Sequence, residues 1–265
     1  MPCKLIITIP HYNNPKGLLK SVLSINETIS IDIIIVDDGS RDQLNEKELK
    51  DKYKNGEIFF KYLSSNQGVG VAANTCLQFA QKSKYEFIAR LDAGDICYKN
   101  KFIKQITYLE KHPEIKLLGT WARVVDLEGN NLYKLKHPIQ YEIIKQKMYF
   151  NSMFLNPSVM FYAKILKEVG DYPLKYKDAA QDYAFFFKVI KKYKAENYPE
   201  ILLDYVITND SISNYRRKLQ VFNRIRIIID NFYFGFIPVY AIARNLILLI
   251  IPVNIITFMK SKIYK

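Results

Sequence analysis

The sequence predicts an α/β fold in which a mostly parallel, mixed sheet is flanked by helices and followed by a helical tail. Two observations lead to this prediction. Up to residue 91, short apolar runs alternate with helical patterns, and such alternation is typical of parallel strands joined by crossover helices. From about residue 211 the chain becomes basic and strongly apolar. We therefore expect one α/β domain at 1–210 and a tail at 211–265.

The first part of the chain contains four short apolar runs, each bounded by turn residues, which is the pattern of buried strands. They are expected at 4–10, 31–36, 58–63 and 85–91. Between them, one helix begins at Pro15, a polar helix covers 45–54, and a third ends near Lys82. The third helix follows a glycine-containing turn at 66–70, which lacks the third glycine of a dinucleotide-binding fingerprint.

After residue 95 the elements follow at less regular spacing. Helices are expected at 99–111, 163–169 and 180–193. Strands are expected at 115–125, 156–161 and 201–207, with a hairpin turn at 128–131.

The positive charge of the chain is concentrated in the tail. Of a formal net charge of +13, +8 falls in 216–265, where nine Lys or Arg accompany one Asp. A basic, apolar segment suits an anionic membrane surface. Nucleic acid is the competing partner for such charge, but the sequence shows no recognised nucleic-acid motif, so we expect no nucleic-acid partner.

The apolar stretch at 236–258 is interrupted by prolines and polar residues, and its clean part, 246–253, is too short to span a bilayer. We expect it to lie in or dip into the membrane interface. The alternative is a pair of helices that packs in a homo-oligomer.

The cysteines and the start of the chain indicate the compartment. Cys3, Cys76 and Cys97 are widely spaced and form no metal or disulfide pattern. A strand-like run follows Met1 at once, which indicates no signal peptide. We expect a cytoplasmic protein that is peripheral on the inner face of the cell membrane.

Acidic residues follow two of the predicted strands. Asp37 and Asp38 follow the second strand, and Asp92 and Asp95 follow the fourth. Carboxyl ends of parallel strands meet at one edge of a sheet, so both pairs can converge on one ligand. A nucleotide diphosphate fits such a site, with Asp38 on the base or ribose and a divalent cation held by Asp92 and Asp95. For Asp92 and Asp95, the alternative is an ordinary surface turn.

A further acid, Asp182, lies at the start of a predicted helix. Taken alone, this position favours compensation of the helix dipole.

Seven short motifs follow one another between residues 4 and 213. They are Ile9-Pro10-His11-Tyr12-Asn13, Val36-Asp37-Asp38-Gly39-Ser40, Asn66-x-Gly68…Asn74, Arg90-Leu91-Asp92-Ala93-x-Asp95, Asn156-Pro157-Ser158-Val159-Met160-Phe161, Gly170-x-Tyr172 and Gln181-Asp182-Tyr183. Their order resembles family 2 glycosyltransferases of the Rossmann-like GT-A fold. The likeness is closest to bacterial enzymes that build surface polysaccharides such as lipopolysaccharide or capsule.

The resemblance implies roles for individual residues in binding a UDP-sugar. Pro10, Tyr12 and Asp38 would hold the uracil and ribose, and Asp37 would support their loop. The remaining residues implied in nucleotide-sugar binding are Asn66, Gly68, Asn74, Arg90 and Asp92.

The resemblance also implies an inverting transfer. Asp182 would be the general base that removes a proton from an acceptor hydroxyl, and UDP would leave from the opposite side of the sugar. Asp92 and Asp95 would form a metal-binding loop for Mn²⁺ or Mg²⁺, whose charge would neutralise the leaving diphosphate. Asn156 and Gln181 would lie near the acceptor.

Three positions depart from the family pattern. Gly94 stands where the family usually has the direct metal ligand, so the cation would be held by Asp92 or Asp95, held weakly, or not needed. Gln181 replaces the usual Glu before the base, and fewer like charges there favour a lower pKa of Asp182. Ala73 replaces a common Arg, so one contact to the donor is lost.

Gly94 and Gln181 also motivate a second hypothesis, a catalytically weak nucleotide-sugar-binding or scaffold subunit. A nucleotidyltransferase is a third, but the chain shows no convincing glycine-rich, Lys-containing motif near its start. The leading hypothesis is an inverting glycosyltransferase with a lipid-linked saccharide acceptor, and it requires Asp38, Asp92 and Asp182 to surround one cavity.

Overall fold

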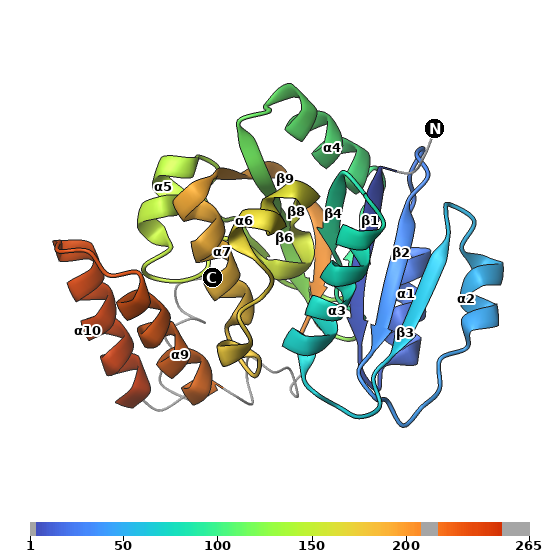
Figure 1. Ribbon diagram of the computed structural model, residues 1–265, viewed down its shortest axis with the longest axis horizontal. Helices are drawn as coiled ribbons and strands as arrows, with labels where there is room; N and C mark the ends of the chain where they lie inside the picture. The colour runs from blue at the N-terminus through green and yellow to red at the C-terminus, as the bar shows by residue number, and fades with distance from the viewer. Residues whose placement is uncertain (1–3, 208–216, 251–265) are drawn as a thin grey trace.

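The computed structural model describes residues 4–207 and 217–250, and these ranges contribute nine strands to one sheet (Figure 1). The strand order is β3-β2-β1-β4-β8-β6-β9-β5, and β7 pairs with β6 beside this path. The strands are β1 (Leu5–His11), β2 (Asp32–Asp37), β3 (Ile58–Tyr62), β4 (Phe87–Arg90), β5 (Ile96–Cys97), β6 (Ile115–Val125), β7 (Asn131–Leu135), β8 (Met160–Tyr162) and β9 (Lys194–Val206).

The first half of the sheet is parallel, as the sequence predicts. β1 lies between β2 and β4, β2 pairs with β3, and all three pairings are parallel. Every residue of β1 is buried, because helices cover both faces of this part of the sheet. The helices are α1 (Pro15–Leu23), α2 (Glu46–Lys52) and α3 (Val69–Lys82). α1 lies behind the sheet in Figure 1 and α3 lies in front of it. The carboxyl ends of β1, β2 and β4 therefore meet at one edge.

The second half of the sheet is mixed. β8 pairs antiparallel with β4 and with β6, while β6 and β9 are parallel. The predicted elements of this half are present with one correction: the strand expected at 156–161 is confined to β8, because the chain turns at Asn156–Ser158. The remaining α-helices are α4 (Lys101–Lys111), α5 (Tyr141–Lys147), α6 (Leu166–Val169) and α7 (Gln181–Lys192). Three 3₁₀ turns accompany them, η1 (Asn156–Ser158), η2 (Ala163–Ile165) and η3 (Leu174–Tyr176). The sequence analysis missed α5, β5 and the first half of β9.

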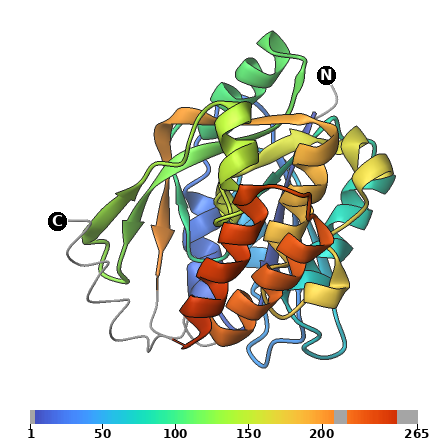
Figure 2. The same ribbon diagram turned by 90° about the vertical axis from the view of Figure 1, so that its left-hand side faces the viewer.

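The C-terminal part forms a helical hairpin of α9 (Arg217–Asp230) and α10 (Phe236–Ile250), which lies beside α5 and α7 (Figures 1 and 2). Ile227 and Ile228 of α9 belong to the same hydrophobic core as the sheet. Among the described residues, no helix is both long and apolar enough to cross a membrane. The expected domain boundary at 210 and positions 251–258 of the expected apolar segment lie outside the described residues.

Candidate active site

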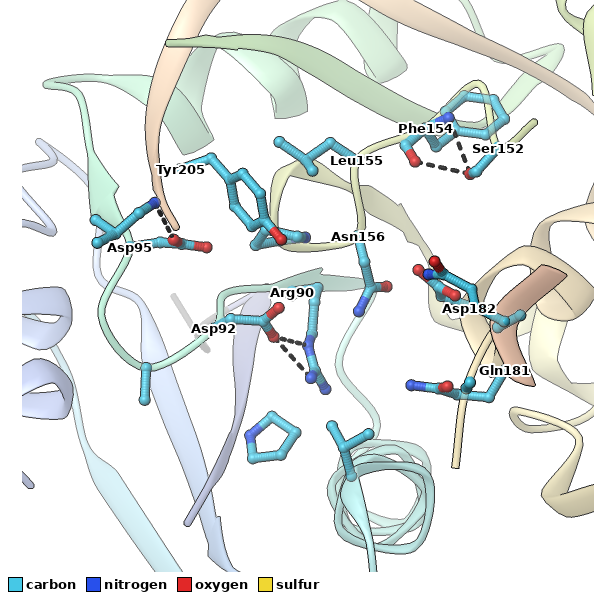
Figure 3. Close-up of a pocket in the computed structure, with 18 of the residues that line it drawn as sticks. Arg90, Asp92, Asp95, Ser152, Phe154, Leu155, Asn156, Gln181, Asp182 and Tyr205 are labelled. Carbon is cyan, nitrogen blue, oxygen red and sulfur yellow. Dashed lines mark hydrogen bonds and ion pairs between the residues drawn. The ribbon is translucent and has the colours of Figure 1, made fainter. Parts of the chain in front are cut away.

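A pocket of about 500 Å³ opens where the carboxyl ends of β1 and β4 approach the start of α7. Both halves of the sheet and the hairpin contribute to its walls. The polar and aromatic residues and the proline considered below that line it are Pro10, Tyr12, Arg90, Asp92, Asp95, His137, Asn156, Gln181, Asp182, Tyr205 and Gln220. Figure 3 shows most of these side chains turned toward a common space.

Arg90, the last residue of β4, forms one wall of the pocket together with Asp92. Oδ1 of Asp92 accepts a hydrogen bond from Nε of Arg90 and forms an ion pair with its Nη2, each at 2.7 Å. Although Arg90 is buried, its Nη1 has no hydrogen-bond partner in the described part of the chain. Burial alone would lower the pKa of Arg90, but Asp92, with smaller contributions from Tyr172 and Cys76, outweighs burial, and the pKa is raised. Arg90 therefore presents a permanent positive charge and a free donor to an anionic ligand.

Asp92 begins a tight loop that is supported from α1. Ser21 Oγ donates to the Asp92 carbonyl and accepts from the N–H of Gly94. Gly94 has φ +118°, where a side chain would be strained, although a Cβ there would meet only Asn14 Nδ2, at 3.5 Å. The backbone of this loop therefore favours glycine over the acid that the family usually places there.

Asp95 closes the same loop and is buried. Its Oδ1 accepts from the N–H of Val206 at 2.9 Å, while Oδ2 is unbonded within the described residues. Burial raises the pKa of Asp95 well above its ordinary value, and the like charge of Asp92 adds to the shift.

Asp182 stands across the pocket from Arg90, in the first turn of α7 (Figure 3). Ala180 precedes the helix in a left-handed conformation, φ 68°, and Asp182 Oδ1 accepts from the N–H of Tyr183 at 2.8 Å. Burial raises the pKa of Asp182, the Tyr183 hydrogen bond opposes the shift, and the charge of Asp92 supports it. A carboxylate with a raised pKa is a stronger base than an ordinary aspartate.

The remaining polar wall is made by residues from the irregular half. Asn156 lies between Arg90 and Asp182 in Figure 3, and its Oδ1 accepts from the hydroxyl of Tyr172 at 3.3 Å. Burial lowers the pKa of His137 to about 4, so this imidazole is neutral at pH 7. Tyr205, at the end of β9, has a raised pKa because of burial and the nearby acids.

Asp37 is one of five predicted donor-binding residues, with Asp38, Asn66, Gly68 and Asn74, that do not line this pocket. Its carboxylate accepts from His11 Nδ1 at 2.7 Å and from the N–H of Ser40 at 2.8 Å. Burial alone would raise the pKa of Asp37, but these hydrogen bonds together outweigh burial, so its pKa is lowered. His11 in turn accepts from the N–H of Asn14 through Nε2. Asp37 thus fixes the loop that carries Tyr12, a supporting position that matches the role the resemblance implies.

Asp38 and Asn74 each bind backbone groups. Asp38 accepts from the N–H groups of Gln67 and Gly68 at 2.8 and 2.9 Å. Asn74 donates through Nδ2 to the carbonyl of Tyr172 and accepts through Oδ1 from the N–H of the same residue, each at 2.9 Å. Asp92 and Asp182 share a cavity as expected, whereas the expectation that Asp38 lines it is not met, because the 67–68 backbone occupies its carboxylate. Gly68 also lies outside the pocket lining.

A cation site can be built from these residues only in part. In residues 4–207 and 217–250, no three His, Cys, Asp or Glu side chains are close enough to hold a metal ion. Asp92 stays 38% exposed at the wall, and Asp95 has one unbonded oxygen. Mg²⁺ often takes one or two carboxylates and completes its shell with substrate phosphates and water. Asp92 and Asp95 fit a cation that is shared with a diphosphate.

Several pocket residues were missed in the sequence. His137, Tyr205 and Gln220 lie on the pocket wall, but none belongs to the motifs quoted above. For Tyr205 a signal existed, since it stands at the carboxyl end of a predicted strand, where α/β sheets bind ligands. His137 and Gln220 come from a loop and from the hairpin, and no local pattern marks them.

The fold and the pocket define an α/β enzyme of the GT-A type that is built around a strand-end carboxylate loop. The family model for glycosyl transferase family 2 matches residues 6–170. The chain belongs to this family and is a glycosyltransferase.

Two relatives place the chain further. An uncharacterized glycosyltransferase, MJ1057, from Methanocaldococcus jannaschii is 35% identical over 77% of this chain and 70% of the relative. The amylovoran biosynthesis glycosyltransferase AmsE from Erwinia amylovora is 24% identical over 97% of both chains.

Solved structures agree with the fold. S. aureus TarS 1-349 in complex with UDP-GlcNAc has a TM-score of 0.67 at 17% identity, covering 92% of this chain and 71% of that one. The chain spans 42% of the longer TarS structure. The mannosyltransferase PcManGT from Pyrobaculum calidifontis, in complex with GDP-Man and Mn²⁺, has a TM-score of 0.64 at 14% identity, covering 93% of this chain and 69% of that one.

Proposed function

We propose that this glycosyltransferase moves a sugar from a UDP-sugar to a hydroxyl of a lipid-linked saccharide, with inversion, during synthesis of a surface polysaccharide such as lipopolysaccharide or capsule. One observation carries the proposal: the pocket sets the Arg90–Asp92 pair opposite Asp182. The name of AmsE supports a role in polysaccharide synthesis, and the UDP-GlcNAc in TarS supports the donor.

The donor would lie against the β1 and β4 side of the pocket. Pro10 and Tyr12 offer an apolar and aromatic surface for the base. The free Nη1 of Arg90 would donate to a phosphate or sugar oxygen, since a charged donor left unpaired in a buried site binds anions strongly. Asp38, Asn66, Gly68 and Asn74 would act on the donor indirectly, by fixing the loops behind this surface.

Asp182 would act as the general base. It takes the proton of the acceptor hydroxyl while that oxygen forms a bond to the anomeric carbon. The bond between this carbon and the diphosphate oxygen breaks, and its electron pair leaves with UDP on the opposite side. Inversion follows because the new bond forms opposite the broken one. The raised pKa of Asp182 suits this role, since it increases the basicity of the carboxylate.

A divalent cation, Mn²⁺ or Mg²⁺, held by Asp92 and Asp95 would neutralise charge on the leaving diphosphate. Arg90 supplies positive charge at the same wall. The chain's own residues thus contribute to leaving-group stabilisation, and PcManGT supports the presence of a cation.

The acceptor would bind on the other side, near Asn156 and Gln181, where neutral His137 and the Tyr205 hydroxyl can hydrogen-bond sugar hydroxyls. We place the protein in the cytoplasm, at the inner face of the membrane, with a domain at 1–210 and a membrane-associating tail from 211. The basic, apolar composition of 216–265 supports this location.

The test is a screen of UDP-sugars and GDP-sugars for nucleotide release, with Mn²⁺, with Mg²⁺ and with a chelator, in the presence of a lipid-linked saccharide. We expect turnover of a UDP-hexose or UDP-N-acetylhexosamine. Turnover of GDP-sugars alone would overturn the donor assignment. Binding of UDP without any turnover would support the alternative of a catalytically weak binding or scaffold subunit, which the glycine at position 94 favours.

A further inference from the structure

The outward face of α10 is apolar along its whole length. The side chains at spacings of three and four residues that face solvent are Phe236, Val239, Tyr240, Leu246, Ile247 and Ile250, and we call them the outer stripe. Phe236 and Ile250, at its two ends, are 81% and 83% exposed. A helix on the surface of a soluble protein normally turns its apolar residues toward the core.

Polar residues of the same helix point inward. Asn245 is fully buried, donates to the Ala241 carbonyl and accepts from Arg224 Nη1. Arg244 donates to the carbonyl of Phe150 at 3.0 Å. α10 is therefore anchored to the protein by hydrogen bonds, and its apolar side is left uncovered by residues 4–207 and 217–250. Figure 2 looks onto this helix, with α5 above one of its ends.

The turn before α10 extends the apolar surface. It carries Phe232, Tyr233 and Phe234, and Phe234 is 99% exposed. Phe232 and Phe234 contact each other edge to face, and Tyr233 packs on Tyr149. Aromatic side chains that are held in place at the end of an amphipathic helix favour the interface of a bilayer.

We propose that the outer stripe and this aromatic turn lie flat on an anionic lipid bilayer. The described part of α10 has 15 residues, and its exposed apolar side chains lie along one side of the helix while Arg244 and Asn245 bond to the protein. Such a one-sided apolar surface fits a position in the interface.

Charge favours a bilayer over a second copy of the chain as the occupant. Within the described hairpin, 217–250, five residues are basic and one, Asp230, is acidic. Asp230 is already paired with Lys175 and the Tyr176 hydroxyl. Two copies that met through this face would bring net positive charge against net positive charge, whereas anionic headgroups neutralise it.

A second basic feature lies beside the aromatic turn. A pocket of about 410 Å³ between α5, α7 and the turn has a floor of Tyr149 and Phe187, with Lys145 and Lys191 on its lining. Both lysines are exposed. They would stand at headgroup level when the turn enters the interface, although Glu142 also lines this pocket and reduces its charge.

The docked hairpin would connect the bilayer to the active site. Gln220 of α9 lines the candidate active site, and Asn223 of the same helix donates to the carbonyl of Ala179, two residues before the α7 segment that carries the base. A lipid-linked acceptor held in the same bilayer would thus meet the pocket without leaving the membrane. The docking surface specifies the membrane association proposed above, and this last step rests in addition on the proposed transfer to a lipid-linked acceptor.

The experiment is co-sedimentation of the full chain with vesicles of phosphatidylcholine alone and of phosphatidylcholine with phosphatidylglycerol. The double variant Leu246→Asp/Ile250→Asp tests the outer stripe. We expect the wild type to bind the anionic vesicles more tightly than the neutral ones. The variant should lose about a hundredfold or more in vesicle affinity, because each apolar side chain loses burial equivalent to about a factor of ten.

The matched control is Leu127→Asp, which changes an exposed leucine on the β6–β7 turn, 67% exposed and away from the hairpin. It should bind vesicles like the wild type. Circular dichroism and UDP binding report whether each variant is folded.

Equal vesicle binding by the wild type and the folded double variant would overturn the proposal. So would a wild-type dimer in sedimentation that the double variant dissociates, since the stripe would then be covered by a second copy. Stripe-dependent vesicle binding by a protein that turns over no nucleotide sugar would overturn the proposed function and leave the docking surface in place.

Discussion

Two groups of polar side chains stand near the same edge of the sheet and differ in what they bind. In both Asp38 and Asn74, the two terminal polar atoms of the side chain are hydrogen-bonded to backbone groups of neighbouring loops. Arg90 and Asp95 each keep one buried atom that has no partner among the described residues. Both groups come from motifs that resemble the family, so motif membership alone does not separate them.

The difference separates supporting residues from residues that are available to a ligand. A buried polar group without a partner costs free energy, which a bound ligand can recover by pairing with it. A group whose bonds are already satisfied gains little from a ligand and mainly stabilises its loop. The predictions below test this division, from the largest expected effect to the smallest.

The largest effect is expected for Asp182→Asn. The amide keeps the shape of the side chain and can still accept from Tyr183, but it cannot take a proton. We expect kcat to fall by about a thousandfold, within the range usual for a general base. The measurement is sugar transfer to an acceptor, with UDP binding followed by calorimetry.

UDP affinity should stay within about twofold, because Asp182 lies on the acceptor side. Asp51→Asn, an exposed position on α2, is the control and should change neither quantity. Full turnover by Asp182→Asn would remove the base from the mechanism.

A smaller effect is expected for Arg90→Lys. The lysine keeps the positive charge. It loses the two guanidinium nitrogens that contact Asp92 and the unpaired N–H group at Nη1. We expect the KM for the donor to rise by about tenfold to a hundredfold, equivalent to the loss of one charge-assisted hydrogen bond or slightly more.

Arg123→Lys is the matched control for Arg90. Arg123 also pairs with an aspartate through Nε and Nη2, at 2.8 and 2.6 Å, although it contacts both oxygens of Asp204 where Arg90 contacts one oxygen of Asp92. Neither Arg123 nor Asp204 lines the candidate active site. Replacement of Arg123 should leave the donor KM unchanged. An equal rise in KM for both variants would mean that the Arg90–Asp92 pair acts through stability alone.

The regular half of the fold was predictable because its strands are continuous buried runs between turn residues. β1 to β4 appear where the sequence places them. The first half of β9 was missed, since it contains polar residues such as Asn197, whose amide bonds the carbonyls of Pro138 and Met153. β5 has two residues and exists only through its pairing with β9. Tertiary contacts of this kind leave no local pattern.

The same limit applies to the site. Asp92 and Asp182 line one pocket, as expected. The position of Asp92 follows from its place at a strand end, whereas Asp182 was placed there by the family resemblance and not by its position at a helix start. The sequence could not show that the carboxylate of Asp38 accepts hydrogen bonds from the N–H groups of Gln67 and Gly68. Every residue except proline has a backbone N–H, so a sequence pattern does not indicate which of them bonds to a given side chain. Motifs identified the neighbourhood, and hydrogen-bond geometry separates the residues within it.

Asp38→Asn tests the supporting group. An amide can accept from only one of the Gln67 and Gly68 N–H groups and turns its own NH₂ toward the other. We expect unfolding free energy to fall by about 2–3 kcal/mol, measured by urea denaturation, with the donor KM of the folded protein nearly unchanged.

Tyr12→Ala is expected to show the opposite pattern, because Tyr12 is exposed in the pocket. The variant protein should keep its unfolding free energy, and its KM for the sugar donor should rise about tenfold. A large rise in KM for Asp38→Asn with unchanged stability would invert the division.

The smallest effect is expected for Asp95→Asn, in the metal-free protein. The raised pKa of Asp95 means that the folded state favours its neutral form. The contribution of neutral Asp95 to the free energy of unfolding is fully present below the unfolded pKa of about 3.9. This contribution is lost as the pH rises through the higher pKa of the folded state. Asparagine keeps the acceptor for Val206 and carries no charge, so at pH 7 Tm should rise by about 2–4 °C and the gain should vanish near pH 4. Asp95→Ala, which removes that acceptor, should lower Tm at both pH values. A Tm gain that does not depend on pH would show that the buried charge of Asp95 carries no cost, and the contrast with the satisfied Asp38 would then fail at this residue.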